Sequence, residues 1–203
     1  MSITAGGASR FTQVDDGSTG TISMTTNEST IIGYEAARLN FGVSQSTIVG
    51  YQAQSDGPAG DRLVLLGART GRLVQEDGVV GIGAEALEMA RHSAGTVAVG
   101  DSAMRGVEQA RGSVAVGAAA GSNLNGDGNV AIGNRAGAAV SADTVVNRSV
   151  AVGEDSAAFA DGAVALGAGA GAGGRDSLAA GAAASAAGRW SAAVGAGAST
   201  AAG

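Results

Sequence analysis

The sequence predicts an all-β fold, a parallel β-solenoid of eleven short rungs. An eight-residue unit, clearest at residues 113–120 (SVAVGAAA), recurs from near residue 30 to the C-terminus. The glycine of the unit, called the anchor glycine below, aligns in eleven copies: Gly33, Gly50, Gly67, Gly83, Gly100, Gly117, Gly133, Gly153, Gly167, Gly181 and Gly195. Even the longest step, from Gly133 to Gly153, is too short for a helix pair and suits one coil of a solenoid. We therefore expect a rod.

The three residues before each anchor glycine form the predicted strand. The first and third of them point the same way, because side chains alternate along a strand. Both positions are mostly Val, Ile or Leu, and the middle position is Ala in most of the later rungs. We expect these strands to supply the core and subunit packing. In the central rungs the packing residues are Val97, Val99, Val114, Ala115, Val116, Val130, Ile132, Val150 and Val152.

A strand that is apolar on both faces must be covered on both faces. A coil as short as that from Gly153 to Gly167 has enough chain for two short strands and two turns, so its own second strand covers one face. A second copy of the molecule is the simplest cover for the other face. We expect the small Ala and Gly residues to face outward there, where they let neighbouring backbones approach closely. The chain is therefore expected to be a homo-oligomer with its rods side by side about an axis.

Two further positions predict the corners of the coil. Three residues after the anchor glycine the side chain is small in every rung, for example Ala103 and Ala120, which predicts a tight inner corner. Six rungs carry Ser four residues before the glycine, and five carry Gly one residue earlier still, such as Gly112. Gly supplies a positive-φ turn into the strand, and the Ser hydroxyl can bond to the backbone there.

The SVAVG-x-x-A unit, repeated at the short step that separates Gly153, Gly167 and Gly181, resembles the head repeat of trimeric autotransporter adhesins, the YadA-like head. The resemblance covers roughly Ser29 to Gly203, and eleven in-register copies make it specific. It implies a left-handed parallel β-roll in a homotrimer. The sequence departs from the family pattern in the longer rungs that precede Gly153, and in Thr30 and Thr47, which stand where Val is usual.

Residues 1–28 lie outside the repeat, and residues 29–203 form the predicted repeat domain. Two short runs, containing Phe11 and Val14 in the first and Ile22 in the second, flank a polar stretch and predict a hairpin. The hairpin either caps the open first rung or docks the rod onto a larger assembly, and both roles are compatible. Phe11, Val14 and Ile22 are therefore candidate attachment residues.

The rungs differ along the predicted rod. The first seven carry longer and more varied loops, which is where binding usually lies on a rigid scaffold. From Gly153 onward the rungs are the shortest in the chain and consist mainly of Ala, Gly and Val, which predicts a slender spacer or tip. Trp190, the sole Trp, belongs to the last rung and is a candidate tip residue. It either packs over the open end, the interpretation we favour, or meets a partner.

Composition argues against several classes of function. Aromatic residues make up 3% of the chain, so we do not expect a bulky core. The net charge of −6, with Arg and Asp mixed ahead of the strands, predicts a solvated ladder and argues against nucleic-acid binding. There is no Cys for a disulfide or a thiolate metal site. Neither a membrane span nor a secretory signal is evident, so we expect no membrane insertion and no export or anchoring parts of an adhesin.

Three short motifs are weak signs of chemistry. Residues 81–83 (GIG) imitate part of a dinucleotide loop, but the pattern arises because Gly replaces Ala in the repeat. Residues 123–128 resemble the start of a calcium loop, yet Asn134 stands at the twelfth position in place of Glu, so a turn is the better interpretation. His92, the only His, fits a solvated loop. We expect no enzyme, catalytic residue, cofactor or metal, and leave open whether a loop binds calcium.

The sequence therefore favours a structural and adhesive rod. The leading hypothesis is a bacteriophage head spike, collar or tail fibre on the virion surface. It would attach to a capsid, collar or tail protein through residues 1–28 and present loops to a glycan or protein receptor on a bacterium. The alternative is the head of a bacterial surface adhesin that binds matrix protein or glycan.

Overall fold

A computed structural model describes residues 28–38, 43–58, 60–137 and 145–201 of the chain. The candidate attachment residues Phe11, Val14 and Ile22 lie outside these ranges. The described residues are all-β, without a helix. The strands are β1 Thr30–Ile32, β2 Thr47–Val49, β3 Val64–Leu66, β4 Val80–Ile82, β5 Val97–Val99, β6 Val114–Val116, β7 Val130–Ile132, β8 Val150–Val152, β9 Ala157–Ala158, β10 Val164–Leu166, β11 Gly171–Ala172, β12 Leu178–Ala180, β13 Ser185–Ala186, β14 Ala192–Val194 and β15 Ser199–Thr200.

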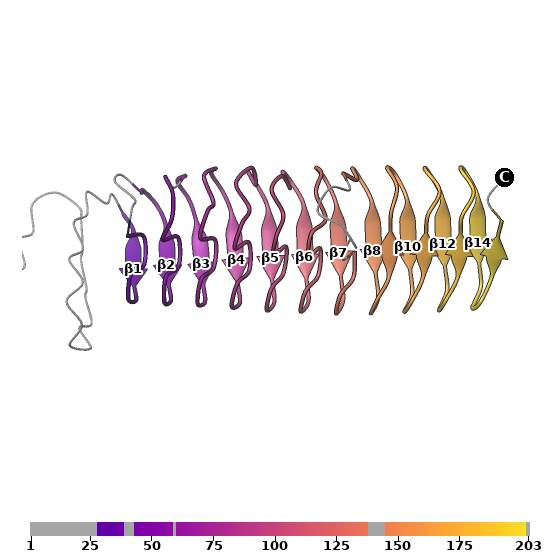
Figure 1. Ribbon diagram of the computed structural model, residues 1–203, viewed down its shortest axis with the longest axis horizontal. Helices are drawn as coiled ribbons and strands as arrows, with labels where there is room; N and C mark the ends of the chain where they lie inside the picture. Colours follow the sequence, from indigo (N-terminus) through magenta and orange to yellow (C-terminus); the bar gives the residue numbers. More distant parts are fainter. Residues whose placement is uncertain (1–27, 39–42, 59, 138–144, 202–203) are drawn as a thin grey trace, which may run out of the picture.

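Eleven of these strands form one parallel sheet in the order β1-β2-β3-β4-β5-β6-β7-β8-β10-β12-β14 (Figure 1). Equivalent residues of neighbouring rungs pair directly, as Ala98 pairs with Ala115. The bonding continues at the anchor glycines, where the N–H of Gly117 donates to the carbonyl of Val99 in the preceding rung at 2.8 Å. The predicted parallel β-solenoid is confirmed. About ten turns of chain connect its eleven rungs.

A second parallel sheet, in the order β15-β13-β11-β9, forms the opposite wall of the C-terminal rungs. It is the second strand that the shortest coils were expected to supply. In the longer rungs before Gly153 the chain returns through turns instead, and Leu87 and Met104 there adopt φ of 55° and 51°. Both side chains are fully buried. The extra residues of the long rungs therefore enclose a wider interior and also fill it.

Two apolar clusters make up the core. The cluster of the first seven rungs contains Leu, Ile, Val and Met side chains, among them Ile48, Leu65 and Met104. The cluster of the C-terminal rungs contains buried alanines alone, among them Ala165 and Ala179. The small residue three places after the anchor glycine is buried from the first rung to the tenth, as predicted for an inner corner.

The structure reverses the predicted orientation of the strands. Ala115 is fully buried, whereas Val114 and Val116 on either side of it are partly exposed, and the middle residue is the buried one in every strand of the eleven-stranded sheet. The expectation that the alanines face outward is therefore wrong. Ile48 and Leu65 hold the same middle position in β2 and β3 and are also fully buried, so this position faces the interior whether its side chain is small or large.

The anchor glycines meet two demands at once. Their φ values lie between 121° and 143°, a region that side chains rarely adopt. A Cβ added to Gly117 would also lie 2.6 Å from the carbonyl carbon of Gly133 in the next rung. Close backbone stacking therefore excludes any side chain at this position.

Gly117→Ala should lower the melting temperature far more than Gly112→Ala. Gly112 has φ 63°, and a Cβ there would meet nothing within 4 Å. Arg148 occupies the same position in another rung at φ 55°, so Gly112→Ala should cost only about 1–2 kcal/mol for the left-handed conformation. Thermal unfolding followed by circular dichroism compares the two variants. Equal losses would contradict the role of backbone stacking.

Candidate assembly interface

The outward face of the eleven-stranded sheet is a continuous apolar strip. None of its residues is buried in the single chain. At about 4.8 Å per rung the strip is about 50 Å long. One row consists of Ile32, Val49, Leu66, Ile82, Val99, Val116, Ile132, Val152, Leu166, Ala180 and Val194, and the other of Thr30, Thr47, Val64, Val80, Val97, Val114, Val130, Val150, Val164, Leu178 and Ala192. We call these two rows the apolar strip.

Exposure on this scale is unusual for a soluble chain. Val116 and Ile132, in the middle of the strip, are 39% and 41% exposed. Monomeric proteins rarely leave a long contiguous apolar patch in water, and larger ones mark an interaction site. The wall formed by the second sheet differs, because the first residues of its strands are small or polar, for example Gly171, Ser185 and Ser199. The apolar strip is therefore the candidate interaction surface of the described residues.

Stacked tyrosines lie next to the N-terminal end of the strip. Tyr34 and Tyr51 each follow an anchor glycine, and their ring centroids lie 5.7 Å apart with the ring planes 9° from parallel. Both rings are exposed. In the same two rungs Thr30 and Thr47 replace Val in the strip. The first two rungs thus differ chemically from the purely aliphatic centre.

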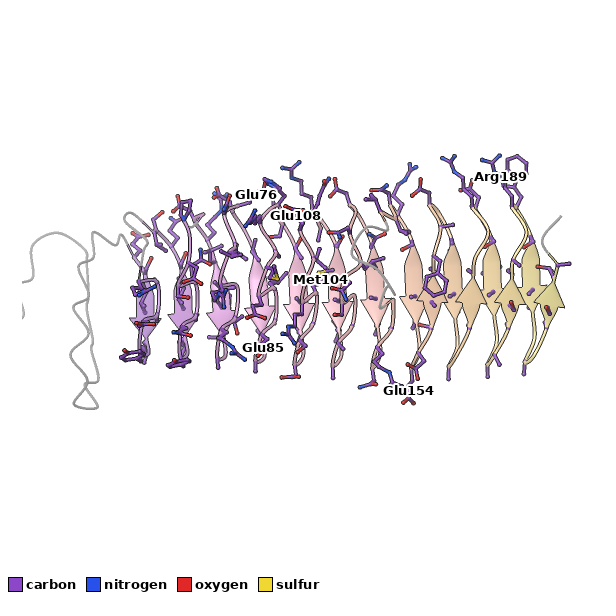
Figure 2. All side chains as sticks on the ribbon, viewed as in Figure 1. Glu76, Glu85, Met104, Glu108, Glu154 and Arg189 are labelled. Atoms are coloured by element: carbon purple, nitrogen blue, oxygen red, sulfur yellow. The ribbon has the colours of Figure 1, made fainter. Side chains whose placement is uncertain are left out.

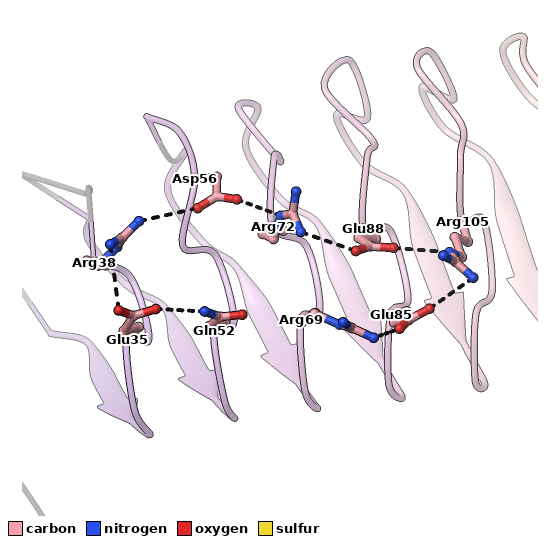
Figure 3. Close-up of polar contacts among 9 residues, drawn as sticks. All are labelled: Glu35, Arg38, Gln52, Asp56, Arg69, Arg72, Glu85, Glu88 and Arg105. Atoms are coloured by element: carbon pink, nitrogen blue, oxygen red, sulfur yellow. Dashed lines mark hydrogen bonds and ion pairs between the residues drawn. The ribbon is translucent and has the colours of Figure 1, made fainter. Parts of the chain in front are cut away.

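Ion pairs connect the turns that follow the strands of the first five rungs (Figure 3). Arg105 Nη1 lies 3.1 Å from Glu85, and its Nε lies 3.1 Å from Glu88. Arg38 closes the other end by pairing with Glu35 at 3.6 Å. Opposite charges therefore face each other from rung to rung, which favours the in-register stack. The whole group consists of Glu35, Arg38, Gln52, Asp56, Arg69, Arg72, Glu85, Glu88 and Arg105.

Asp and Asn side chains bond to the backbone at the opposite corner, six residues before the anchor glycine. Asp77 Oδ1 accepts the N–H of Asp61 in the preceding rung at 2.9 Å, and Asp161 Oδ1 accepts that of Asn147 at 2.8 Å. The latter bond lowers the pKa of Asp161. Each of these carboxylates thus binds the backbone of the preceding rung. The predicted mixed-sign column therefore includes a hydrogen-bonded ladder.

A further cluster at this corner joins residues far apart in the sequence. Glu76 accepts bonds from Nη2 of Arg111 at 2.6 Å and from the backbone N–H of Ala94 at 2.8 Å, and Nδ1 of His92 lies 3.5 Å away. The bond with Arg111, followed by the other contacts, lowers the pKa of Glu76 to about 2. The His92 side chain is half exposed, as expected for a solvated loop.

The calcium-like motif at 123–128 and the dinucleotide-like motif at 81–83 both have structural roles in the coil. Asn125 Oδ1 accepts the backbone N–H of Glu108 at 2.7 Å, so residues 123–128 form a bend tied to the preceding rung. Gly81 makes room for packing, because a Cβ there would lie 3.0 Å from Leu65 and 3.2 Å from Leu87. Within the described ranges no three His, Asp or Glu side chains are placed to hold a metal ion. No membrane-spanning helix occurs in the same ranges.

Trp190 is 72% exposed in the single chain, so the interpretation that it packs over the open end is wrong. It stands five residues before its anchor glycine, at a corner with φ 55°. Arg62 and Arg148 hold this position in other rungs with similar φ. The presence of arginine in that column of the repeat would have identified a solvent-facing corner.

The predicted packing residues divide between two surfaces. Val97, Val99, Val114, Val116, Val130, Ile132, Val150 and Val152 lie in the apolar strip, and Ala115 lies inside the coil. The ion-paired group of the first five rungs was not predicted. Part of its signal is visible in the sequence, because positions two and five after the glycine are both Arg in the third rung and both Glu in the fourth. In comparisons with protein-family models and with curated proteins, the chain matches none.

Acid should weaken the fold partly through Glu76. Its pKa is lowered from 4.5 to about 2 in the folded chain, so its contribution to stability is complete above about pH 4.5 and is lost as the pH falls toward 2. Glu76→Gln should lower the melting temperature at pH 7 and flatten the acid dependence of unfolding between pH 5 and 2. Glu108→Gln is the control, because that carboxylate makes only a 3.8 Å pair with Arg91. A parallel pH dependence in the Glu76 variant and the wild type would contradict this role.

Proposed function

We propose that the chain is a homotrimeric, left-handed β-roll that serves as an attachment rod, a fibre or spike on the surface of a virion. The observation that carries the proposal is the apolar strip, which runs along all eleven rungs. The apolar strip of a second copy can cover this strip along its whole length, because the rungs of both copies have the same spacing. The number of three copies and the left hand rest on the resemblance of the SVAVG unit to YadA-like heads.

The distribution of titratable groups favours attachment over catalysis. Glu76, Glu85 and Glu88 are engaged by arginines, and Asp77 and Asp161 bond to backbone amides. These contacts stabilise the stack of rungs and do not gather reactive groups in one hollow. Three chains in one rod would present every surface feature three times, so weak contacts with a bacterial surface glycan or protein would add up through avidity.

The second candidate is the head of a bacterial surface adhesin that binds matrix protein or glycan. The SVAVG repeat favours it, because the family that the repeat resembles carries this unit on the bacterial surface. Both candidates share the trimeric rod and differ in what holds its N-terminal segment. For the virion the partner of residues 1–28 would be a capsid, collar or tail protein.

Immunogold electron microscopy with antibodies against the purified rod tests the placement. A virion component should be labelled on particles, and the purified protein should reduce adsorption of those particles to their host. Labelling of intact bacterial cells in the absence of particles would select the adhesin. Absence of labelling on both surfaces would contradict attachment altogether.

Val116→Asp should dissociate the assembly, because it places a charge in the middle of a stack of aliphatic side chains. Sedimentation velocity at concentrations where the wild type is fully assembled should show a single-chain species or an unfolded one. Unchanged mass together with an unchanged melting curve would count against the proposed interface.

Phe159→Asp is the matched control for this variant. Phe159 is also an exposed apolar residue, 46% accessible, but it follows β9 in the second sheet. Assembly should survive this change. If the Phe159 variant dissociates and the Val116 variant does not, subunits meet through the second sheet and the apolar strip has another role.

A further inference from the structure

The C-terminal rungs carry an aromatic side chain that the coil does not use. Trp190 is 72% exposed, the highest value among the large apolar side chains described. Figure 2 shows the neighbouring Arg189 at the outer corner of these rungs, pointing away from the rod. An exposed indole has an apolar surface that water solvates poorly, so a large Trp at such a corner is unfavourable unless something covers it.

The backbone at this corner adds a second unfavourable contribution. Trp190 has φ 55°, a conformation that is an outlier for bulky residues. Gly occupies the same position in five other rungs, for instance Gly95 and Gly112, which adopt φ of 66° and 63°. The left-handed conformation costs a residue with a side chain about 1–2 kcal/mol. A glycine would relieve both the strain and the exposure, and would lose only the contact of the indole with Arg189.

One arginine side chain contacts the indole, and the backbone of a second arginine lies beside it. The guanidinium carbon of Arg189 lies 4.9 Å from the Trp190 ring centroid, and the backbone N–H of Trp190 donates to the carbonyl of Arg175 at 3.0 Å. Arg175 and Arg189 both stand six residues before an anchor glycine, in adjacent rungs. Arg189 has no ion pair with any carboxylate of the described residues, and Arg175 has one contact of 3.9 Å, with Asp176. Donors of both guanidinium groups are thus left for a ligand.

The charge around Trp190 differs from that of the whole chain. The protein has a net charge of −6, but residues 175–203 contain two arginines, Arg175 and Arg189, and one carboxylate side chain, Asp176. This end of the rod therefore does not repel an anion as the rest of the surface would. In the first five rungs, by contrast, arginines such as Arg72 and Arg105 are paired with carboxylates.

We propose that Trp190, Arg189 and Arg175 form a binding site for a carboxylated sugar of a surface polysaccharide. The C–H face of a sugar ring would stack on the free face of the indole. Its carboxylate would accept paired hydrogen bonds from a guanidinium group, a geometry that arginine matches better than lysine. The inference deepens the attachment function proposed above and depends on it only for its biological setting.

Two other ligands would fit parts of this site less well. A single-stranded nucleic acid would also stack on Trp and bind Arg, but its phosphates would meet a chain of charge −6. An anionic membrane would need more than one Trp and two Arg for firm attachment, because each basic residue near such a surface contributes only about 1 kcal/mol. A single carboxylated sugar needs just one stacking face and one or two guanidinium groups.

Fluorescence tests the site directly, because Trp190 is the sole Trp and reports this position alone. The intact protein is titrated with an oligogalacturonide, a chain of carboxylated sugars, and with its methyl ester, which keeps the rings and removes the charge. The acid should give a saturable change, and the ester should bind roughly tenfold more weakly or worse. Calorimetry should show binding lost in Trp190→Ala and weakened roughly tenfold in Arg189→Gln.

Arg91→Gln is the control for charge, since it removes one exposed arginine elsewhere, and it should bind like the wild type. Equal binding of acid and ester, no binding of either, or preferential binding of anionic vesicles or single-stranded DNA would overturn the proposal. Iodide quenching of Trp190 fluorescence in the assembled, unliganded protein is a further test. Absence of quenching would also overturn the proposal, because Trp190 would then be a subunit contact. Sedimentation of the wild type and of Trp190→Ala separates the two proposals. If the variant assembles but does not bind the sugar, both proposals are supported. If the wild type itself does not assemble, the trimer is contradicted and the sugar site is not.

Discussion

The structure depends on one constraint, which is that the backbone of each rung lies within hydrogen-bonding distance of the next rung around most of the coil. Bonds such as that from Gly117 to Val99 recur at every step. A side chain that widened one rung at one point would separate the rungs on both sides. The anchor glycine and the buried corner at Ala120 are consequences of this stacking. The sequence repeats because each rung must satisfy the same geometry as its neighbours.

Close stacking also limits the core. In the C-terminal rungs the apolar core consists of alanines, such as Ala165 and Ala179, and each buries about one methyl group, worth roughly 0.8 kcal/mol. The larger apolar side chains of the same rungs, such as Val164 and Leu166, are partly exposed in the strip. Much of the available apolar surface is therefore left outside the core of the single chain. We infer that folding and assembly support each other, and most strongly in the C-terminal rungs.

The repeat predicts the rungs because a solenoid converts sequence period into structure directly. It does not predict which face is inside. Alternation groups Val114 with Val116 and separates them from Ala115, but both groups are apolar, so polarity does not tell the inner face from the outer one. The exposure of Trp190 could have been predicted, because Arg62 and Arg148 share its position. The bond between Glu76 and Arg111, two rungs apart, could not, because long side chains reach past the neighbouring rung.

The same constraint decides where recognition can occur on such a rod. Inward positions are filled by the core, and outward strand positions form the apolar strip. Only the corners can carry a side chain that neither the fold nor the assembly requires. In the first five rungs the charges of these corners, such as Arg105 with Glu85 and Glu88, satisfy one another and so tie the rungs together. Arg189 and Trp190 contact each other but have no such carboxylate partner among the described residues. We infer that recognition on a rod of this construction lies at corners whose charged side chains are not paired with one another.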